Sequence, residues 1–136
     1  AVGGRIVTAY RIRSILRHEV PTLAPDMPMR RAVAILVETK SAAAPVMTDD
    51  GRLVGILTQK DCFRPALHAS YHRDWTGLVR DHMSAEVVTV DIDDEVIRVA
   101  EMFLDLPHRL FPVLDQGHVA GMIHRSDVLG LLIRMG

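Results

Sequence analysis

Two pairs of side chains combine residue types that bind ligands with the spacing of about one helical turn. Asp61 follows Thr58 by three residues, and Asp127 follows His124 by the same distance. A carboxylate in such a pair accepts strong, charge-assisted hydrogen bonds from the hydroxyl groups of a ligand. Where a strand runs into a helix, the free N–H groups of the helix amino end suit a phosphate. The Thr58 pair also has the spacing of a capping box, so it indicates ligand binding, helix capping or both.

Three further side chains have types that catalytic or metal sites use. His68 and His72 are four residues apart, a metal-ligand spacing on a helix, but no carboxylate or cysteine is arranged with them. We therefore expect an ordinary exposed helix face there and no metal site. Cys62 is the only cysteine, which favours a reducing cytoplasm, and it is expected to pack in the core. No nucleophile–base pair or phosphate-binding glycine loop is found, so the chain is not expected to be an enzyme.

The composition is that of an ordinary globular domain. The chain has 136 residues, of which 49% are hydrophobic and 24% charged, enough apolar material for a packed core. A formal net charge of −1 and 4% aromatic residues give no basis for nucleic-acid binding. No apolar run approaches the roughly 20 residues that cross a bilayer, and the N-terminus lacks the features of a secretory leader. The expected compartment is the cytoplasm, with neither nucleic acid nor membrane as a partner.

The chain contains the same pattern twice. Residues 20–23 align with 87–90 at an offset of 67 (87 minus 20), and the offset falls to 66 after a later turn. This repetition indicates the duplication of one unit, whose copies pack together and bury the faces that each leaves uncovered. The identical pairs include Asp26 and Asp93, Pro45 and Pro112, Val46 and Val113, Gly51 and Gly117, Gly55 and Gly121, and Asp61 and Asp127.

Each copy is predicted to run strand, helix, strand, strand, helix. A β-branched stretch is followed by an amphipathic helix, then by two strands around a turn with Asp and Gly, and then by a second helix. In the first copy these elements are expected at 20–23, 28–39, 44–48 and 53–57, with the last helix from 59; in the second they are expected at 87–90, 96–104, 111–114 and 119–123, with the last helix from 125. The expected organisation is a helical N-terminal extension at 1–14, a first repeat at 15–70, a connection at 71–78 and a second repeat at 79–136.

These repeats resemble those of the CBS-domain family. Residues 55–61 (Gly-Ile-Leu-Thr-Gln-Lys-Asp) and 121–127 (Gly-Met-Ile-His-Arg-Ser-Asp) are similar to the Gly-apolar-apolar-Thr/Ser-x-x-Asp signature that ends a CBS repeat. Pro45 and Pro112 begin segments similar to the Pro-Val-apolar strand that precedes the signature. The resemblance covers 15–135 and implies an α+β fold. It further implies a stand-alone CBS-domain pair, or Bateman module, whose two strand-helix-strand-strand-helix repeats are related by a pseudo-twofold axis.

The resemblance also implies where ligands bind. Members of the family commonly hold AMP, ADP, ATP or S-adenosylmethionine in clefts between the tandem repeats, with the signature Asp on the ribose hydroxyls. The signature Thr or Ser contacts ribose or phosphate. The residues carried over to this chain are Thr22, Ala44, Pro45, Thr58 and Asp61 for one cleft, and Thr89, Arg109, Phe111, Pro112, His124 and Asp127 for the other.

The two clefts are expected to differ. His124 stands where the signature has Thr or Ser; it can donate to a phosphate, more strongly when protonated, or fill the cleft with its bulk. Arg109 occupies a position where family members often place a basic residue, whereas Ala42 stands at that position of the first copy. The cleft of Thr58 and Asp61 keeps the full signature, so we rank it first for nucleoside recognition.

Three functions are compatible with these residues. The first is a regulatory module that requires no cofactor, senses an adenine nucleotide, forms a homodimer and signals by conformational change to an effector protein. The alternative is a purely structural dimerisation module with degenerate, empty clefts, which His124 and the uncharged Ser41 and Ala42 favour. A small metal-assisted hydrolase acting through His68 and His72 ranks last.

Overall fold

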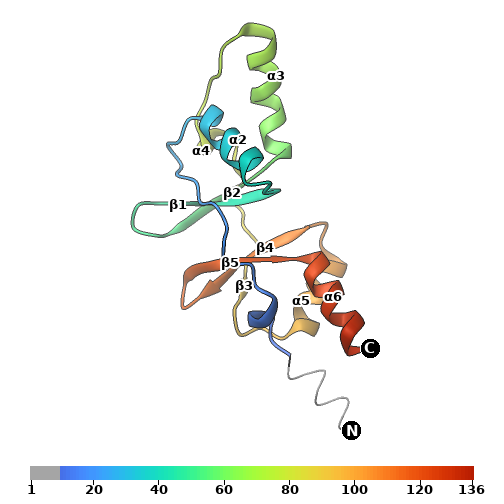
Figure 1. Cartoon of the computed structure of the whole chain (residues 1–136). Coiled ribbons are helices and arrows are strands. Elements are labelled where there is room, and N and C mark those ends of the chain that lie inside the picture. The colour runs from blue at the N-terminus through green and yellow to red at the C-terminus, as the bar shows by residue number, and fades with distance from the viewer. Residues whose placement is uncertain (1–9) are drawn as a thin grey trace. The chain divides into compact units, whose positions relative to one another are not determined.

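The computed structural model describes residues 10–136 and contains two copies of a mixed helix-and-strand pattern (Figure 1). The predicted α+β fold class and the duplication are thereby confirmed. Residues 1–9 of the predicted N-terminal extension lie outside the described part of the chain. The elements are η1 (Ile12–Ile15), α2 (Met29–Glu38), β1 (Ala43–Met47), β2 (Leu53–Thr58), η2 (Lys60–Cys62), α3 (Phe63–His72), α4 (Val79–His82), β3 (Val90–Asp91), α5 (Val96–Asp105), β4 (Leu110–Asp115), β5 (His118–His124) and α6 (Arg125–Met135).

The described residues form two compact units that cut across the sequence repeats. One unit, called here the first-repeat unit, consists of 20–87, and the second-repeat unit consists of 10–19 together with 88–136. Each unit therefore holds the sheet and the longer helices of one repeat together with the short segment at which the other repeat begins.

In the first-repeat unit, β1 and β2 form an antiparallel hairpin that α2, α3 and α4 cover on one side (Figure 1). Gly51, at φ +85°, supplies the left-handed backbone that the turn requires. Leu23 lies parallel to β1, since its N–H donates to the Pro45 oxygen at 3.0 Å and its oxygen accepts from the Met47 N–H at 2.8 Å. The strand predicted at 20–23 is thus represented by one paired residue. The buried core consists of Leu23, Met29, Ala32, Leu36, Ala44, Val46, Leu57, Cys62 and Val79.

In the second-repeat unit, β4 pairs with β3 in parallel and with β5 antiparallel, giving a sheet of order β3-β4-β5. The turn between β4 and β5 has two residues, Gln116 and Gly117, both with positive φ. This tight hairpin turn is one residue shorter than that of the first copy, which explains why the offset falls from 67 to 66. The buried core consists of Ile12, Leu16, Val90, Ile92, Val96, Val99, Phe111, Val113, Ile123, Val128 and Leu131.

The segment that begins each repeat pairs with the last strand of the other repeat. The Arg17 N–H donates to the Met122 oxygen at 2.9 Å, and the Met122 N–H donates back to the Arg17 oxygen at 3.0 Å. Ser84 and Ile56 exchange the same two hydrogen bonds at 2.9 and 3.0 Å. Because Ser84 follows Arg17 at the offset of 67 (84 minus 17), these two residues occupy equivalent places in the two units.

The signature glycines permit this close approach. A Cβ atom at Gly121 would collide with the backbone oxygen of Arg17. At Gly55 it would lie 2.5 Å from the Met83 sulfur and 2.9 Å from the Ser84 oxygen. Glycine is therefore required in both copies by the crossing backbone rather than by the conformation of its own strand.

The helices are short and bury one face while leaving apolar side chains on another. In α2, Met29, Ala32 and Leu36 are buried, whereas Val37 is 64% exposed. In α6, the longest helix with 11 residues, Leu131 is buried and Ile133 is exposed. A helix needs about 20 residues to cross a bilayer. Among residues 10–136, no helix has the length and apolar character for that.

Candidate functional site

In the first-repeat unit, Thr58 and Asp61 hold each other across the junction of β2 with η2. The Thr58 N–H donates to Asp61 Oδ2 at 2.9 Å, and the Asp61 N–H donates to Thr58 Oγ1 at 3.2 Å. The reciprocal hydrogen bonds of the capping box that the sequence indicated are therefore present, one residue before Gln59, the N-cap of η2. They use Thr58 Oγ1 as an acceptor, so the hydroxyl proton stays available. Within the described part of the chain, Asp61 Oδ1 accepts no hydrogen bond from another residue, and Asp61 forms no ion pair.

The other residues predicted for this site lie on adjacent segments of the same unit. Ala44 and Pro45 are buried on β1, where Ala44 pairs with Leu57, the residue before Thr58. Thr22 precedes Leu23, whose N–H bonds to the Pro45 oxygen. All five predicted residues are thus brought to one region, with backbone groups of β1 beside the Thr58–Asp61 pair.

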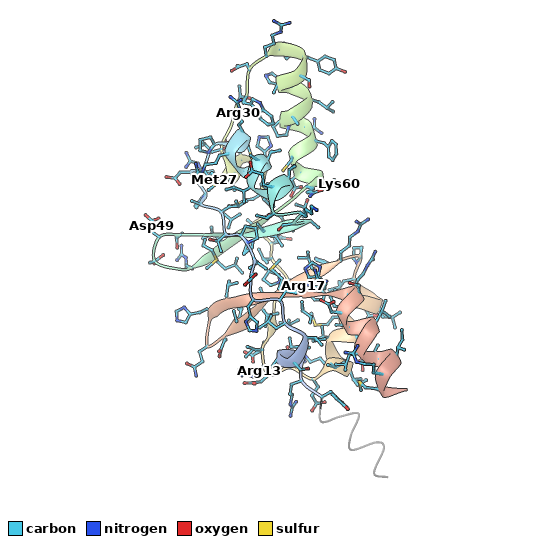
Figure 2. All side chains as sticks on the ribbon, viewed as in Figure 1. Arg13, Arg17, Met27, Arg30, Asp49 and Lys60 are labelled. Atoms are coloured by element: carbon cyan, nitrogen blue, oxygen red, sulfur yellow. The ribbon has the colours of Figure 1, made fainter. Side chains whose placement is uncertain are left out.

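In the second-repeat unit, the Asp127 carboxylate is bound by an arginine. Arg17 Nε donates to Asp127 Oδ2 at 2.7 Å, and Arg17 Nη2 donates to Asp127 Oδ1 at 3.1 Å (Figure 2 labels Arg17). The two N–H donors of the planar guanidinium match the geometry of the carboxylate and occupy both of its oxygens. The hydrogen bond from Arg17 lowers the pKa of Asp127 and raises the pKa of the Arg17 guanidinium. Asp127 is therefore an ionised carboxylate that already has a cationic partner.

Sequence reasoning did not find Arg17. The two residues of the pair are 110 positions apart in the chain. The available signal was the offset of 67, which aligns Arg17 with Ser84 near the start of the second repeat, predicted at 79–136. That alignment identifies an equivalent position, but it does not reveal that the side chain reaches Asp127.

His124 ends β5 opposite Leu110 and precedes α6 without a side-chain capping bond. Burial lowers its pKa, the Arg17 charge lowers it further, and the Asp127 carboxylate partly opposes both. The lowered pKa favours the neutral imidazole at pH 7 over the protonated form, which would donate more strongly to a phosphate.

The remaining predicted residues of this unit lie around the same sheet. Phe111 and Pro112 are buried on β4, and Thr89 directly precedes β3. Arg109 is exposed, and its backbone oxygen accepts from the Arg125 N–H at 2.9 Å, which puts both arginines at the end of the sheet where α6 begins. Every residue predicted for the second site therefore lies in the second-repeat unit.

The cavities of the two units differ in position and polarity. An open cavity of about 350 Å³ in the second-repeat unit includes the ion pair in its wall, whereas a cavity of about 190 Å³ in the first-repeat unit is apolar and includes neither Thr58 nor Asp61. The smaller cavity lies between α2 and the start of α3, so we do not assign it to nucleoside recognition. The larger cavity is lined by Ile15, Leu16, Arg17, Ser126, Asp127, Gly130 and Arg134, and the smaller by Val33, Leu36, Val37, Gln59, Cys62, Phe63 and Ala66.

The residues considered for metal binding or nucleophilic chemistry do not form a reactive group. The rings of His68 and His72 lie 4.6 Å apart on α3, but no cluster of three or more metal-ligating side chains exists within residues 10–136. Burial and the Asp61 charge raise the pKa of the Cys62 thiol to about 11, so the reactive thiolate is scarce at pH 7.

Sequence comparisons match both repeats to one family. The family model described as CBS domain matches residues 12–67 and 79–134. An uncharacterized protein of Methanocaldococcus jannaschii, MJ1225, is 23% identical over 121 residues, which is 89% of this chain and 42% of that protein. The inosine-5'-monophosphate dehydrogenase of Thermoplasma acidophilum is 27% identical over 120 residues, 88% of this chain and 23% of the enzyme. The chain thus spans less than half the length of these two relatives.

Solved structures share the fold over nearly the whole chain. The structure of CBSX2 in complex with AMP has a TM-score of 0.78 at 23% identity and covers 93% of this chain and 98% of its own. The CBS domain pair of protein MJ0100, in complex with 5'-methylthioadenosine and S-adenosyl-L-methionine, has a TM-score of 0.77 at 22% identity and covers 94% and 99%. At these identities the likeness establishes the fold of the two repeats.

Proposed function

Because the chain belongs to the CBS-domain family, we propose that it is a regulatory module that binds an adenine nucleotide at the Thr58–Asp61 site. A CBS-domain pair is a regulatory and not a catalytic domain, and the dehydrogenase related to this chain extends far beyond the matched part. The observation that carries the proposal is the state of Asp61, whose carboxylate forms no ion pair with the residues described and is held in place by the Thr58 N–H.

The arrangement suits a ribose. Asp61 Oδ1 can accept a charge-assisted hydrogen bond from a ribose hydroxyl, and Thr58 Oγ1 can donate its free proton to a ribose or phosphate oxygen. Thr22, Ala44 and Pro45 supply the surroundings of the base in this proposal.

The ligands named for similar structures support the class of ligand. CBSX2 was crystallised with AMP, and the CBS pair of MJ0100 with two other adenosine derivatives. We take AMP as the first candidate, with ADP, ATP and S-adenosylmethionine as the others. A ligand regulates only if it binds two states of the module with different affinity, so the proposed signal is a change that an effector protein detects.

The proposal is tested by titrating AMP into the wild-type chain, Asp61→Asn and Asp49→Ala, using calorimetry. Asp61→Asn keeps an acceptor for the Thr58 N–H but removes the charge, so we expect the affinity to fall about tenfold or more. Asp49 is exposed in the β1–β2 turn and serves as the matched control, with an unchanged affinity expected. Equal binding by wild type and Asp61→Asn would refute this site.

We also propose that two copies of the chain associate through their helices. Apolar side chains are exposed at matching positions of the two units, on α2 and α3 in one and on α5 and α6 in the other. The matching pairs are Val37 and Leu104, Phe63 and Leu129, and Leu67 and Ile133. Sedimentation experiments test this association by comparing wild type with Phe63→Asp and Leu129→Asp. Dimers are expected only for wild type.

A purely structural dimer is the second candidate function, and the Arg17–Asp127 pair favours it because one signature carboxylate is already bound. That function requires both sites to stay empty. It is distinguished by thermal unfolding, since a ligand at 100 times its dissociation constant adds about 2.7 kcal/mol of stability to the folded state. If the melting temperature is the same with and without AMP, ADP, ATP and S-adenosylmethionine, the structural role is established.

A further inference from the structure

The two signature carboxylates have different partners although their surroundings are equivalent. Arg17 and Ser84 each exchange two backbone hydrogen bonds with the last strand of the unit, at Met122 and Ile56 respectively. From this position the long side chain of Arg17 reaches Asp127, whereas the side chain of Ser84 bonds to the Glu86 oxygen at 3.3 Å, two residues along its own segment. The residue type at this one position therefore accounts for the presence of a cation beside one carboxylate.

The ion pair and a bound ribose compete for the same atoms. Arg17 donates to both Oδ1 and Oδ2 of Asp127 at 3.1 and 2.7 Å. A ribose diol recognised by this carboxylate would donate its two hydroxyl groups to those oxygens. The pair also lines the open cavity of about 350 Å³, so the competition takes place where a ligand can enter.

We propose that Arg17 is the specificity-determining residue of the second site: paired with Asp127, it closes that carboxylate to ribose, so the chain binds one adenine nucleotide and not two. The equivalent residue, Ser84, leaves the Asp61 carboxylate open. This inference rests on the proposed function, because it assumes that Asp61 and Asp127 are ribose-binding positions. It assigns the difference between the sites to Arg17 rather than to His124, which replaces the signature Thr or Ser.

Exchanging the residues at the two equivalent positions tests the inference. Calorimetric titration with AMP is carried out on wild type, Arg17→Ser, Ser84→Arg and the double exchange. Arg17→Ser should bind a second AMP per chain, and Ser84→Arg should weaken binding about tenfold or more, because the new guanidinium competes for Asp61. In the double exchange, binding should become sensitive to Asp127→Asn instead of Asp61→Asn.

Arg13→Ser is the matched control. Arg13 lies in the same segment and forms an exposed ion pair with Asp93 at 2.9 Å, away from the signature (Figure 2). Its removal should leave the stoichiometry at the wild-type value. Circular dichroism confirms that each variant is folded, which is expected because Arg17 and Ser84 are both exposed.

The outcomes separate this inference from the proposed function. Binding of one AMP by wild type and still one by Arg17→Ser would overturn the role of Arg17 and leave the Asp61 site standing. Binding by Arg17→Ser alone would support Arg17 as the closing residue and refute the Asp61 site. Binding by neither protein would overturn both.

Discussion

In the first-repeat unit the Asp61 carboxylate is held by the Thr58 N–H at the end of β2, three residues before it, whereas in the second-repeat unit Asp127 is held by Arg17, 110 residues away in the chain. Both units have an antiparallel hairpin, a register shift directly after the valine of the Pro-Val strand (Val46 and Val113), and a backbone segment packed against a glycine of the second hairpin strand. The difference shows that duplication preserved the scaffold while one residue of that backbone segment changed the chemistry of a signature carboxylate.

The helix faces of the two units also differ, through the size of their side chains. The apolar cavity of about 190 Å³ in the first-repeat unit is lined by Leu36, Cys62 and Ala66 among others. The second-repeat unit has Phe103, Val128 and Leu132 at the equivalent positions, and the ring of Phe103 stacks on Phe111 at 4.4 Å. The side chains at these three positions are thus larger in the second-repeat unit than in the first-repeat unit.

The largest expected effect concerns Gly55 and Gly121, which lie against the backbone of Ser84 and Arg17 respectively. Gly121→Ala should lower the free energy of unfolding by about 3 kcal/mol, because its Cβ collides with the Arg17 backbone oxygen, and Gly55→Ala by about 1–2 kcal/mol, because its Cβ meets the flexible Met83 side chain and approaches the Ser84 backbone oxygen less closely. Urea unfolding followed by circular dichroism measures both.

The control for this prediction is Gly130→Ala in α6. The nearest atom to its added Cβ is Arg134 Nη1 at 3.7 Å, so alanine fits and should stabilise the helix by about 0.5–1 kcal/mol. Similar losses at Gly121 and Gly130 would show that the backbone segment packed against Gly121 does not set the requirement for glycine.

Filling the first-repeat cavity should give an intermediate effect. Ala66→Leu introduces the side chain that Leu132 supplies in the other unit and should raise the free energy of unfolding by about 1 kcal/mol. Leu132→Ala should act in the opposite direction, as the matched removal. Thermal and urea unfolding are compared at a protein concentration where all variants have the same association state. A loss of stability in Ala66→Leu would mean that the cavity cannot accept the larger side chain.

The smallest expected effect is a dependence of stability on pH through His124. Its pKa is lowered in the folded unit, so the unfolded chain takes up the proton first as the pH falls below about 6.5. The neutral imidazole therefore contributes stability above that pH, which is lost as the pH falls through the folded pKa. His124→Gln should flatten the decline in unfolding free energy between pH 7 and pH 5, as measured by urea unfolding.

Burial is the main cause of the lowered His124 pKa, and two charged groups modify it: Arg17 lowers this pKa further and Asp127 raises it. Arg17→Ser should therefore weaken the same decline, because the larger of the two charge effects is removed. An unchanged pH dependence in both variants would assign the decline to other groups.

The fold was largely predictable from the sequence, and the site in part. Identical residues at a nearly constant offset located both hairpins and both pairs of helices, and the Thr58–Asp61 spacing indicated the capping that the structure contains. The strand expected at 20–23 reduces to Leu23, because pairing with β1 involves only that residue in the first-repeat unit. Arg17 could not be assigned, since no local pattern relates it to Asp127.

The sequence by itself determined the duplication, the order of elements and the positions of the two signature carboxylates, because these depend on local periodicity and on residues near each other in the chain. Only the tertiary structure decided which segment completes each unit and which carboxylate receives a cation. The physical reason is that the backbone pairing of Arg17 with Met122 brings a charge beside Asp127 from a distant part of the chain, and the strength of such a contact depends on separation in space.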